Sequence, residues 1–189
     1  MSDNLRAYTK ALYGFDHVVR LIPSDGWDQP TPCEGWTARD VVGHVVAVQR
    51  YIESLIADRA PTLNPYESPG AIAGGDPAAT WSHTRDDLLG AMDAPGVLHR
   101  TVQSFRGPES VDSAIGWNVV DTLTHAWDLA RSAGVDDRLD PVSVRHALSM
   151  AAPMITHMRH PPFFGPAASV GDDADPQATL LAMLGRSTD

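Results

Sequence analysis

The sequence lacks the features that define several classes of protein. It has a single cysteine, Cys33, so no internal disulfide framework can form. No apolar run approaches the roughly 20 residues that are needed to span a bilayer. Residues 1–14 also lack the basic and apolar regions of a signal peptide. We therefore expect a cytoplasmic protein that has no membrane partner.

Positive charge is scarce, with 14 Lys and Arg against 24 Asp and Glu and a formal net charge of −10. A surface of this sign repels phosphate backbones, so the composition argues against nucleic acid as a partner. The sequence also has no glycine-rich phosphate loop and no G-x-S-x-G motif. With 43% hydrophobic residues, the 189-residue chain is expected to fold as a single domain over residues 1–189.

Helical periodicity accounts for most of the apolar residues. We expect four long helices, then a fifth and a short terminal one: 4–22, a second that begins at 37, 77–94, 113–132, 141–158 and 177–184. Residues 98–105 alternate weakly, which fits a short strand or an extended crossing. The pattern predicts an all-α four-helix bundle with a long crossover connection after the second helix and short accessory C-terminal helices.

The second helix has a clear start. Thr37 and Asp40 have the spacing of a capping box, with Asp in place of the usual Glu or Gln. This start fixes the phase of the helix, so that His44 faces the core or its edge. Taken alone, His44 would be a buried histidine with a satisfied hydrogen bond. An Asp40–His44 pair is an alternative, but the capping role explains Asp40 better.

Asp121 and His125 are four residues apart in a segment with the pattern of a helix, so their side chains share one face. Trp117 and Leu129 flank them, which makes this helix apolar on more than one side and places it centrally. A buried Asp is costly unless it is paired or coordinated. The spacing fits half of a metal site, and it fits a partly exposed Asp–His pair equally well.

A bundle can bring His44 against this pair, which would give two imidazoles and one carboxylate with an open position for water or substrate. Zinc is the first expectation, and nickel or iron(II) would accept the same ligands. Asp128 could accept a hydrogen bond from His125, or could bind Arg131 or a backbone group. Cys33 is expected to be packed and structural, and His157 and His160 are expected to lie in a loop or on the surface.

Three segments resemble a known family when they are taken together and in order. They are PTPCEGWTARDVVGHVV (30–46), DTLTHAWDLARSAG (121–134) and LLAMLGR (180–186). They are similar to actinobacterial metal-binding proteins related to the mycothiol-dependent maleylpyruvate isomerase N-terminal domain, in the DinB-like superfamily. The resemblance implies a DinB-like four-helix bundle that holds a divalent metal through His44, Asp121 and His125.

Two departures from the family pattern accompany this resemblance. The isomerase of the family has Glu where this chain has Asp121, and it carries a further C-terminal domain. Asp is shorter than Glu by one methylene group, so the metal would lie closer to the helix or be bound differently. Both departures bear on the isomerase activity more than on the metal site.

The resemblance also implies a function. The protein would be a metal-dependent, mycothiol-dependent S-transferase or isomerase that acts on a small electrophile, with mycothiol as cosubstrate and a homodimer as an option. Trp36, Trp117 and residues 61–76 would form walls of the pocket, and no general acid or base can be identified. The alternatives are a non-catalytic metal- or small-ligand-binding protein of the same fold, or a structural Asp–His pair without metal.

Overall fold

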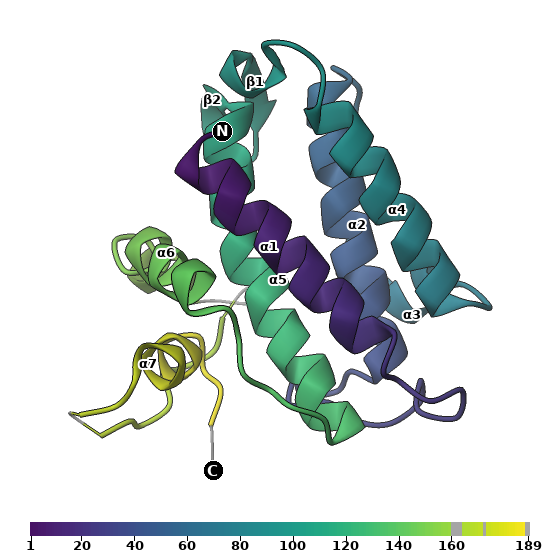
Figure 1. Cartoon of the computed structure of the whole chain (residues 1–189), viewed down its shortest axis with the longest axis vertical. Coiled ribbons are helices and arrows are strands. Elements are labelled where there is room, and N and C mark those ends of the chain that lie inside the picture. Colours follow the sequence, from purple (N-terminus) through teal and green to yellow (C-terminus); the bar gives the residue numbers. More distant parts are fainter. Residues whose placement is uncertain (160–163, 172, 188–189) are drawn as a thin grey trace.

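Four long helices form the body of the structure (Figure 1): α1 (Asp3–Val19), α2 (Ala38–Ile56), α4 (Pro77–Met92) and α5 (Val111–Ala133). This is a computed structural model that describes residues 1–159, 164–171 and 173–187. The smaller elements are α3 (Pro69–Ala73), η1 (Val97–His99), β1 (Thr101–Ser104), β2 (Gly107–Ser110), α6 (Pro141–Ala151), η2 (Ile155–Met158) and α7 (Pro176–Met183). The predicted four-helix bundle with accessory C-terminal helices is confirmed.

The long helices run in two parallel pairs. At the start of α1, Asn4 donates a hydrogen bond of 2.9 Å to Asp112 at the start of α5, so these two helices point the same way. Likewise α2 and α4 run together, because Arg39 bonds the carbonyl of Gly74 just before α4, and Arg50, further along α2, bonds Asp87. Figure 1 shows α1 and α5 running opposite to α2 and α4.

The parallel arrangement of α2 and α4 requires the predicted crossover. The chain leaves α2 at Ile56 and returns to the other end of that helix, where the Gly70 N–H of α3 donates to the Asp40 carboxylate at 2.9 Å. The backbone of α3 lies directly on α2 at Gly43. A Cβ added at Gly43 would come within 1.7 Å of the Pro69 carbonyl oxygen. Glycine at this position therefore allows the crossover to close against the helix.

The structure refines the sequence prediction in two segments, the connection before α5 and the end of the fifth helix. Residues 101–110 form an antiparallel hairpin of β1 and β2. Strand β1 is the short strand that was one of the two expectations for residues 98–105. The fifth helix was expected to reach residue 158, but α6 ends at Ala151. Pro153 explains the difference, because it has no backbone N–H to donate to the preceding turn. Ala152 itself keeps helical backbone, and the chain continues into the 3-10 helix η2.

Helix α5 lies at the centre of the fold and is buried on nearly every side. Large side chains fill the core around it, among them Trp81 and Phe15, whose rings meet edge to face at 4.6 Å. Several polar side chains of α5 are buried as well: Asn118, Thr122, Thr124, His125 and Asp128. Among the described residues, no helix is both long and apolar enough to cross a membrane.

The contact at Gly43 predicts the effect of one added methyl group. Gly43→Ala should lower the free energy of unfolding by about 1–3 kcal/mol, because the new Cβ must displace the backbone of α3. Urea denaturation followed by circular dichroism measures this change. Gly14→Ala is the matched control, since Gly14 lies in α1 with nothing within 4 Å of an added Cβ. It should be neutral or slightly stabilising. Equal stability of the two variants would contradict the close approach.

Candidate metal centre

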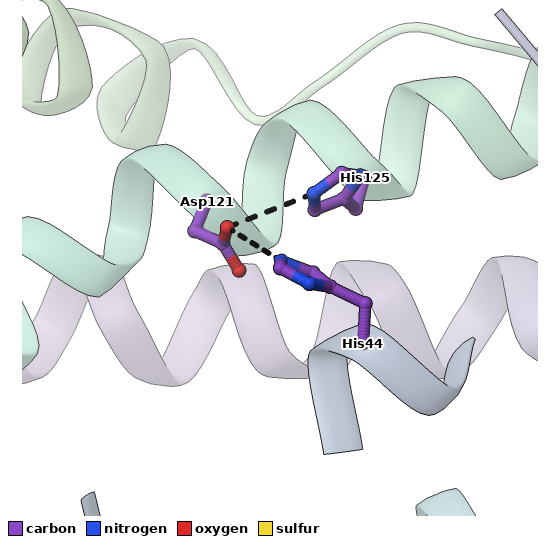
Figure 2. A group of neighbouring side chains, drawn as sticks. All are labelled: His44, Asp121 and His125. Atoms are coloured by element: carbon purple, nitrogen blue, oxygen red, sulfur yellow. Dashed lines mark hydrogen bonds and ion pairs between the residues drawn. The ribbon is translucent and has the colours of Figure 1, made fainter. Parts of the chain in front are cut away.

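Three side chains from two helices meet at one point (Figure 2). His44 comes from α2, and Asp121 and His125 come from successive turns of α5. The Nε2 atoms of His44 and His125 lie 3.2 and 3.6 Å from the Oδ1 atom of Asp121. All three ligand atoms lie within 4.8 Å of one another. Ligands bound to one zinc ion in a tetrahedral shell lie roughly 3–3.5 Å apart, so a small adjustment would close this group on an ion.

Local sequence signals place His44 at this point. The capping box at the start of α2 is present, with the Thr37 N–H donating to the Asp40 carboxylate at 2.9 Å. Asp40 also accepts a hydrogen bond from the Gly70 N–H, so its carboxylate both caps α2 and binds the backbone of α3. His44 then points inward and is only 2% exposed. The capping interpretation of Asp40 is confirmed.

The outer nitrogen of each imidazole is held by an acceptor. The Nδ1 atom of His44 lies 3.0 Å from the carbonyl oxygen of Pro65, and the Nδ1 atom of His125 lies 3.0 Å from Oδ2 of Asp128. A carbonyl or carboxylate oxygen can only accept, so both Nδ1 atoms carry the proton. In the neutral rings the lone pairs of the two Nε2 atoms therefore face Asp121. This is the orientation that metal-binding histidines adopt.

The centre consequently holds an excess of hydrogen-bond acceptors. The two Nε2 lone pairs face a carboxylate, and the Oδ2 atom of Asp121 is buried without a hydrogen-bond partner. Burial raises the pKa of the Asp121 carboxyl, but the positive charge that His44 and His125 carry when protonated, a hydrogen bond with His44 and the charge of Arg186 outweigh it and lower that pKa overall. The carboxylate thus stays ionised. An ionised carboxylate and two imidazole lone pairs suit a divalent cation that supplies the missing positive charge.

A second ion pair supports His125 from behind. Asp128 is fully buried and accepts from Arg186 at 2.9 Å (Nη2 to Oδ2) and 3.3 Å (Nε to Oδ1). Burial raises the pKa of Asp128, but hydrogen bonds from His125 and Arg186 outweigh this and lower it. Of the two alternatives for Asp128, the bond to His125 is the one formed, whereas Arg131 pairs with Asp137. Residue spacing could not reveal Arg186, because it lies 58 positions beyond Asp128 and after α7.

The centre opens into a cavity of about 710 Å³. Among its described lining residues are Trp36, Trp117 and part of the predicted 61–76 wall, at positions 61 and 63–66. The ring of Trp36 lies 4.9 Å from that of His44 and 6.0 Å from that of His125, measured between centroids. Sequence reasoning missed Tyr51 and Phe105 as lining residues. Periodicity cannot place a hairpin turn such as the one at Phe105 over a helix.

The remaining candidate residues do not join the centre. Cys33 lines the cavity, and burial raises its pKa to about 11, so the thiol is protonated at neutral pH. A protonated thiol is a poor nucleophile, which agrees with the structural role expected for Cys33. His157 lies exposed in η2, as expected, while His160 lies outside the described residues.

The Asp128–Arg186 pair predicts a large effect of removing one partner. Arg186→Met should lower the free energy of unfolding by about 3–5 kcal/mol, because the charge of Asp128 would stay buried without its cation. Urea denaturation of the metal-free protein measures the change. The double variant Asp128→Asn, Arg186→Met should recover part of the loss. Arg138→Met, which breaks an exposed pair with Asp136, should leave stability unchanged and serves as the control. Wild-type stability of Arg186→Met would refute the prediction.

Comparison with known proteins identifies relatives of this fold and sequence. The family described as "Mycothiol maleylpyruvate isomerase N-terminal domain" matches residues 9–130. The uncharacterized protein Rv0738 of Mycobacterium tuberculosis is 30% identical over 191 aligned positions, which cover 98% of each chain. The uncharacterized protein Rv0036c of the same organism is 28% identical over 139 positions, covering 64% of this chain and 52% of its own.

Solved structures share the fold. A crystal structure of a mutant of the mycothiol-dependent maleylpyruvate isomerase superimposes with a TM-score of 0.62 at 14% sequence identity. A further crystal structure of the mycothiol-dependent maleylpyruvate isomerase gives 0.60 at 18% identity, and both alignments cover 82% of this chain and 70% of the other. The predicted DinB-like fold is thereby confirmed. Because the family match spans well over half of the sequence, this chain belongs to the mycothiol maleylpyruvate isomerase N-terminal domain family.

Proposed function

We propose that the protein binds one divalent metal ion through Nε2 of His44, the carboxylate of Asp121 and Nε2 of His125. The observation that carries this proposal is the convergence of the two Nε2 atoms and the Asp121 carboxylate within 4.8 Å of one another, next to the unpartnered Oδ2 atom of Asp121. Zinc suits two imidazoles and one carboxylate best, and nickel or iron(II) would accept the same set. All three residues lie within the part of the chain that matches the family.

We further propose a thiol-dependent reaction on a small electrophile, with mycothiol as the thiol. The family, named for mycothiol maleylpyruvate isomerase, and the related crystal structures of the mycothiol-dependent enzyme support mycothiol. When bound, the metal would stabilise the thiolate form of the cosubstrate at neutral pH. In a transfer, the thiolate sulfur forms a bond to carbon, and the leaving group departs with its electron pair. In an isomerisation, the thiol adds and is later released unchanged.

The chain's own residues would orient the reactants and exclude water. Pro65 and Asp128 fix the two imidazole rings through their Nδ1 atoms, so that both Nε2 atoms keep their direction without further reorganisation. The Trp36 ring covers both imidazoles and shields them from solvent. No described side chain is assigned as general acid or base, and the thiol proton passes to solvent.

Metal content tests the first part of the proposal. Protein purified without an affinity tag should contain close to one equivalent of metal, or should take up one equivalent of Zn²⁺ in a calorimetric titration. His44→Ala and Asp121→Asn should lose stoichiometric binding, because each removes one of the three ligands. His83→Ala, at an exposed position on α4, is the control and should bind normally. Less than a tenth of an equivalent in the wild type would refute the metal site.

Turnover tests the second part. The zinc-loaded protein should accelerate conjugation of mycothiol to a small alkyl halide. The rate is measured as the loss of free thiol and compared with a protein-free control. His125→Ala should abolish the acceleration, and His83→Ala should retain it. Stoichiometric metal without any acceleration would refute the catalytic proposal, and would favour a non-catalytic metal- or ligand-binding protein of the same fold.

A further inference from the structure

The cavity has two chemically different ends. One end holds the metal centre with Trp36. The other is reached along α2 from His44 and along α5 from Asp121, since these helices run antiparallel, and it is lined by Val48, Tyr51, Phe105 and Trp117. Phe105 comes from the β1–β2 turn and is 61% exposed, so this end lies beneath the hairpin and reaches the surface. The second end therefore offers mainly aromatic and aliphatic surface.

The arginine side chains in and near the cavity are already paired with carboxylates. Among the described lining residues, Arg186 is the sole cationic side chain, and it bonds both oxygens of Asp128 and the carbonyl of Leu184. Arg106 lies over the Trp117 ring at 5.6 Å from the centroid and over Phe105 at 5.7 Å, but it is paired with Glu109. An anionic group entering the end beside Trp117 and Phe105 would meet one arginine, Arg106, whose charge is engaged with Glu109. Arg186 lies at the other side of the metal centre, where it is engaged with Asp128.

Two polar side chains of α5 that line the cavity donate hydrogen bonds to backbone carbonyls of the same helix. The Thr124 hydroxyl donates to the Val120 carbonyl at 2.7 Å, and the Asn118 amide donates to the Ala114 carbonyl at 3.0 Å. A carboxylate that left water for this surface would lose its hydration without gaining a charged partner from these groups, since both side chains are neutral. Such an uncompensated transfer costs several kcal/mol. An aromatic or alkyl group would instead gain from burial against Trp117 and Tyr51.

We infer that the electrophile is an uncharged molecule with an aromatic or other apolar group, which binds beside Trp117 and Phe105 with its reactive carbon toward the metal centre. This inference rests on the proposed function for the reaction, and it names the class of substrate. It separates this protein from an enzyme built for a dicarboxylate such as maleylpyruvate. A dicarboxylate would need at least one unpaired cation at this end, and the described lining residues supply none.

A matched ligand pair tests the inference without turnover. Methyl 2-naphthoate and 2-naphthoate share one ring system and differ in charge. In the metal-free protein, quenching of tryptophan fluorescence should show the ester binding at least tenfold more tightly than the carboxylate. The same preference should persist in Asp121→Asn, which removes a lining carboxylate, so that repulsion from Asp121 is excluded as the cause of the preference. Equal or tighter binding of the carboxylate, or no binding of either ligand, would overturn the inference.

Variants of an exposed residue locate the binding end. Phe105→Ala should weaken binding of the ester at least threefold. Phe105→Lys should narrow the preference for the ester, because it adds an unpaired cation at an exposed position that folding tolerates. Leu21→Ala, at an exposed apolar residue that does not line the cavity, is the control and should leave both affinities unchanged. An unchanged ester affinity in Phe105→Ala would place the ligand elsewhere and refute the assignment.

Turnover then separates this inference from the proposed function. With zinc and mycothiol, methyl 4-(bromomethyl)benzoate should react with a higher kcat/KM than 4-(bromomethyl)benzoate, after each rate is divided by the uncatalysed rate. Preferential binding of the naphthoate ester without turnover of either bromide would refute the catalytic proposal and leave the inference about the binding site standing. Turnover that favours the carboxylate would refute the inference and leave the catalytic proposal standing.

Discussion

Two imidazole nitrogens and a carboxylate oxygen face one another at the junction of α2 and α5, and each is an acceptor. Acceptors cannot satisfy one another, so the arrangement persists only where a cation or extra protons supply positive charge. The surrounding bonds sustain this orientation, because Pro65 and Asp128 bind the outer nitrogen of each ring. The crossover and the C-terminal residues therefore have a shared role, since each provides a group that keeps a lone pair directed inward.

The same constraint explains how distant parts of the chain serve one centre. The crossover supplies Pro65 and rests on α2 through the close approach at Gly43. Arg186, which follows α7, pairs with Asp128. Without it, Asp128 would be a fully buried and unpaired charge beside His125. Because that arginine is engaged in supporting the centre, its charge is not free for a substrate.

Much of the fold could be predicted from local signals. The capping box of Thr37 and Asp40 gave the start of α2 and the direction of His44, and the apolar periodicity gave the four long helices. The end of α6 was predicted wrongly because a helical apolar pattern continues past Pro153, which cannot donate the next backbone hydrogen bond of the α-helix. Joining His44 to Asp121 and His125 depended on the family resemblance, since residue spacing alone left a metal half-site and a surface pair equally favoured.

The sequence by itself determined the features that depend on near neighbours: helix starts, the shared face of Asp121 and His125, and the inward phase of His44. Only the tertiary structure decided which atoms meet across the chain. Arg186 reaches Asp128 over 58 positions, and the turn at Phe105 covers a cavity lined by α2 and α5. These contacts arise from packing between elements, whose geometry is set by side-chain volume and by the crossover path rather than by any local period.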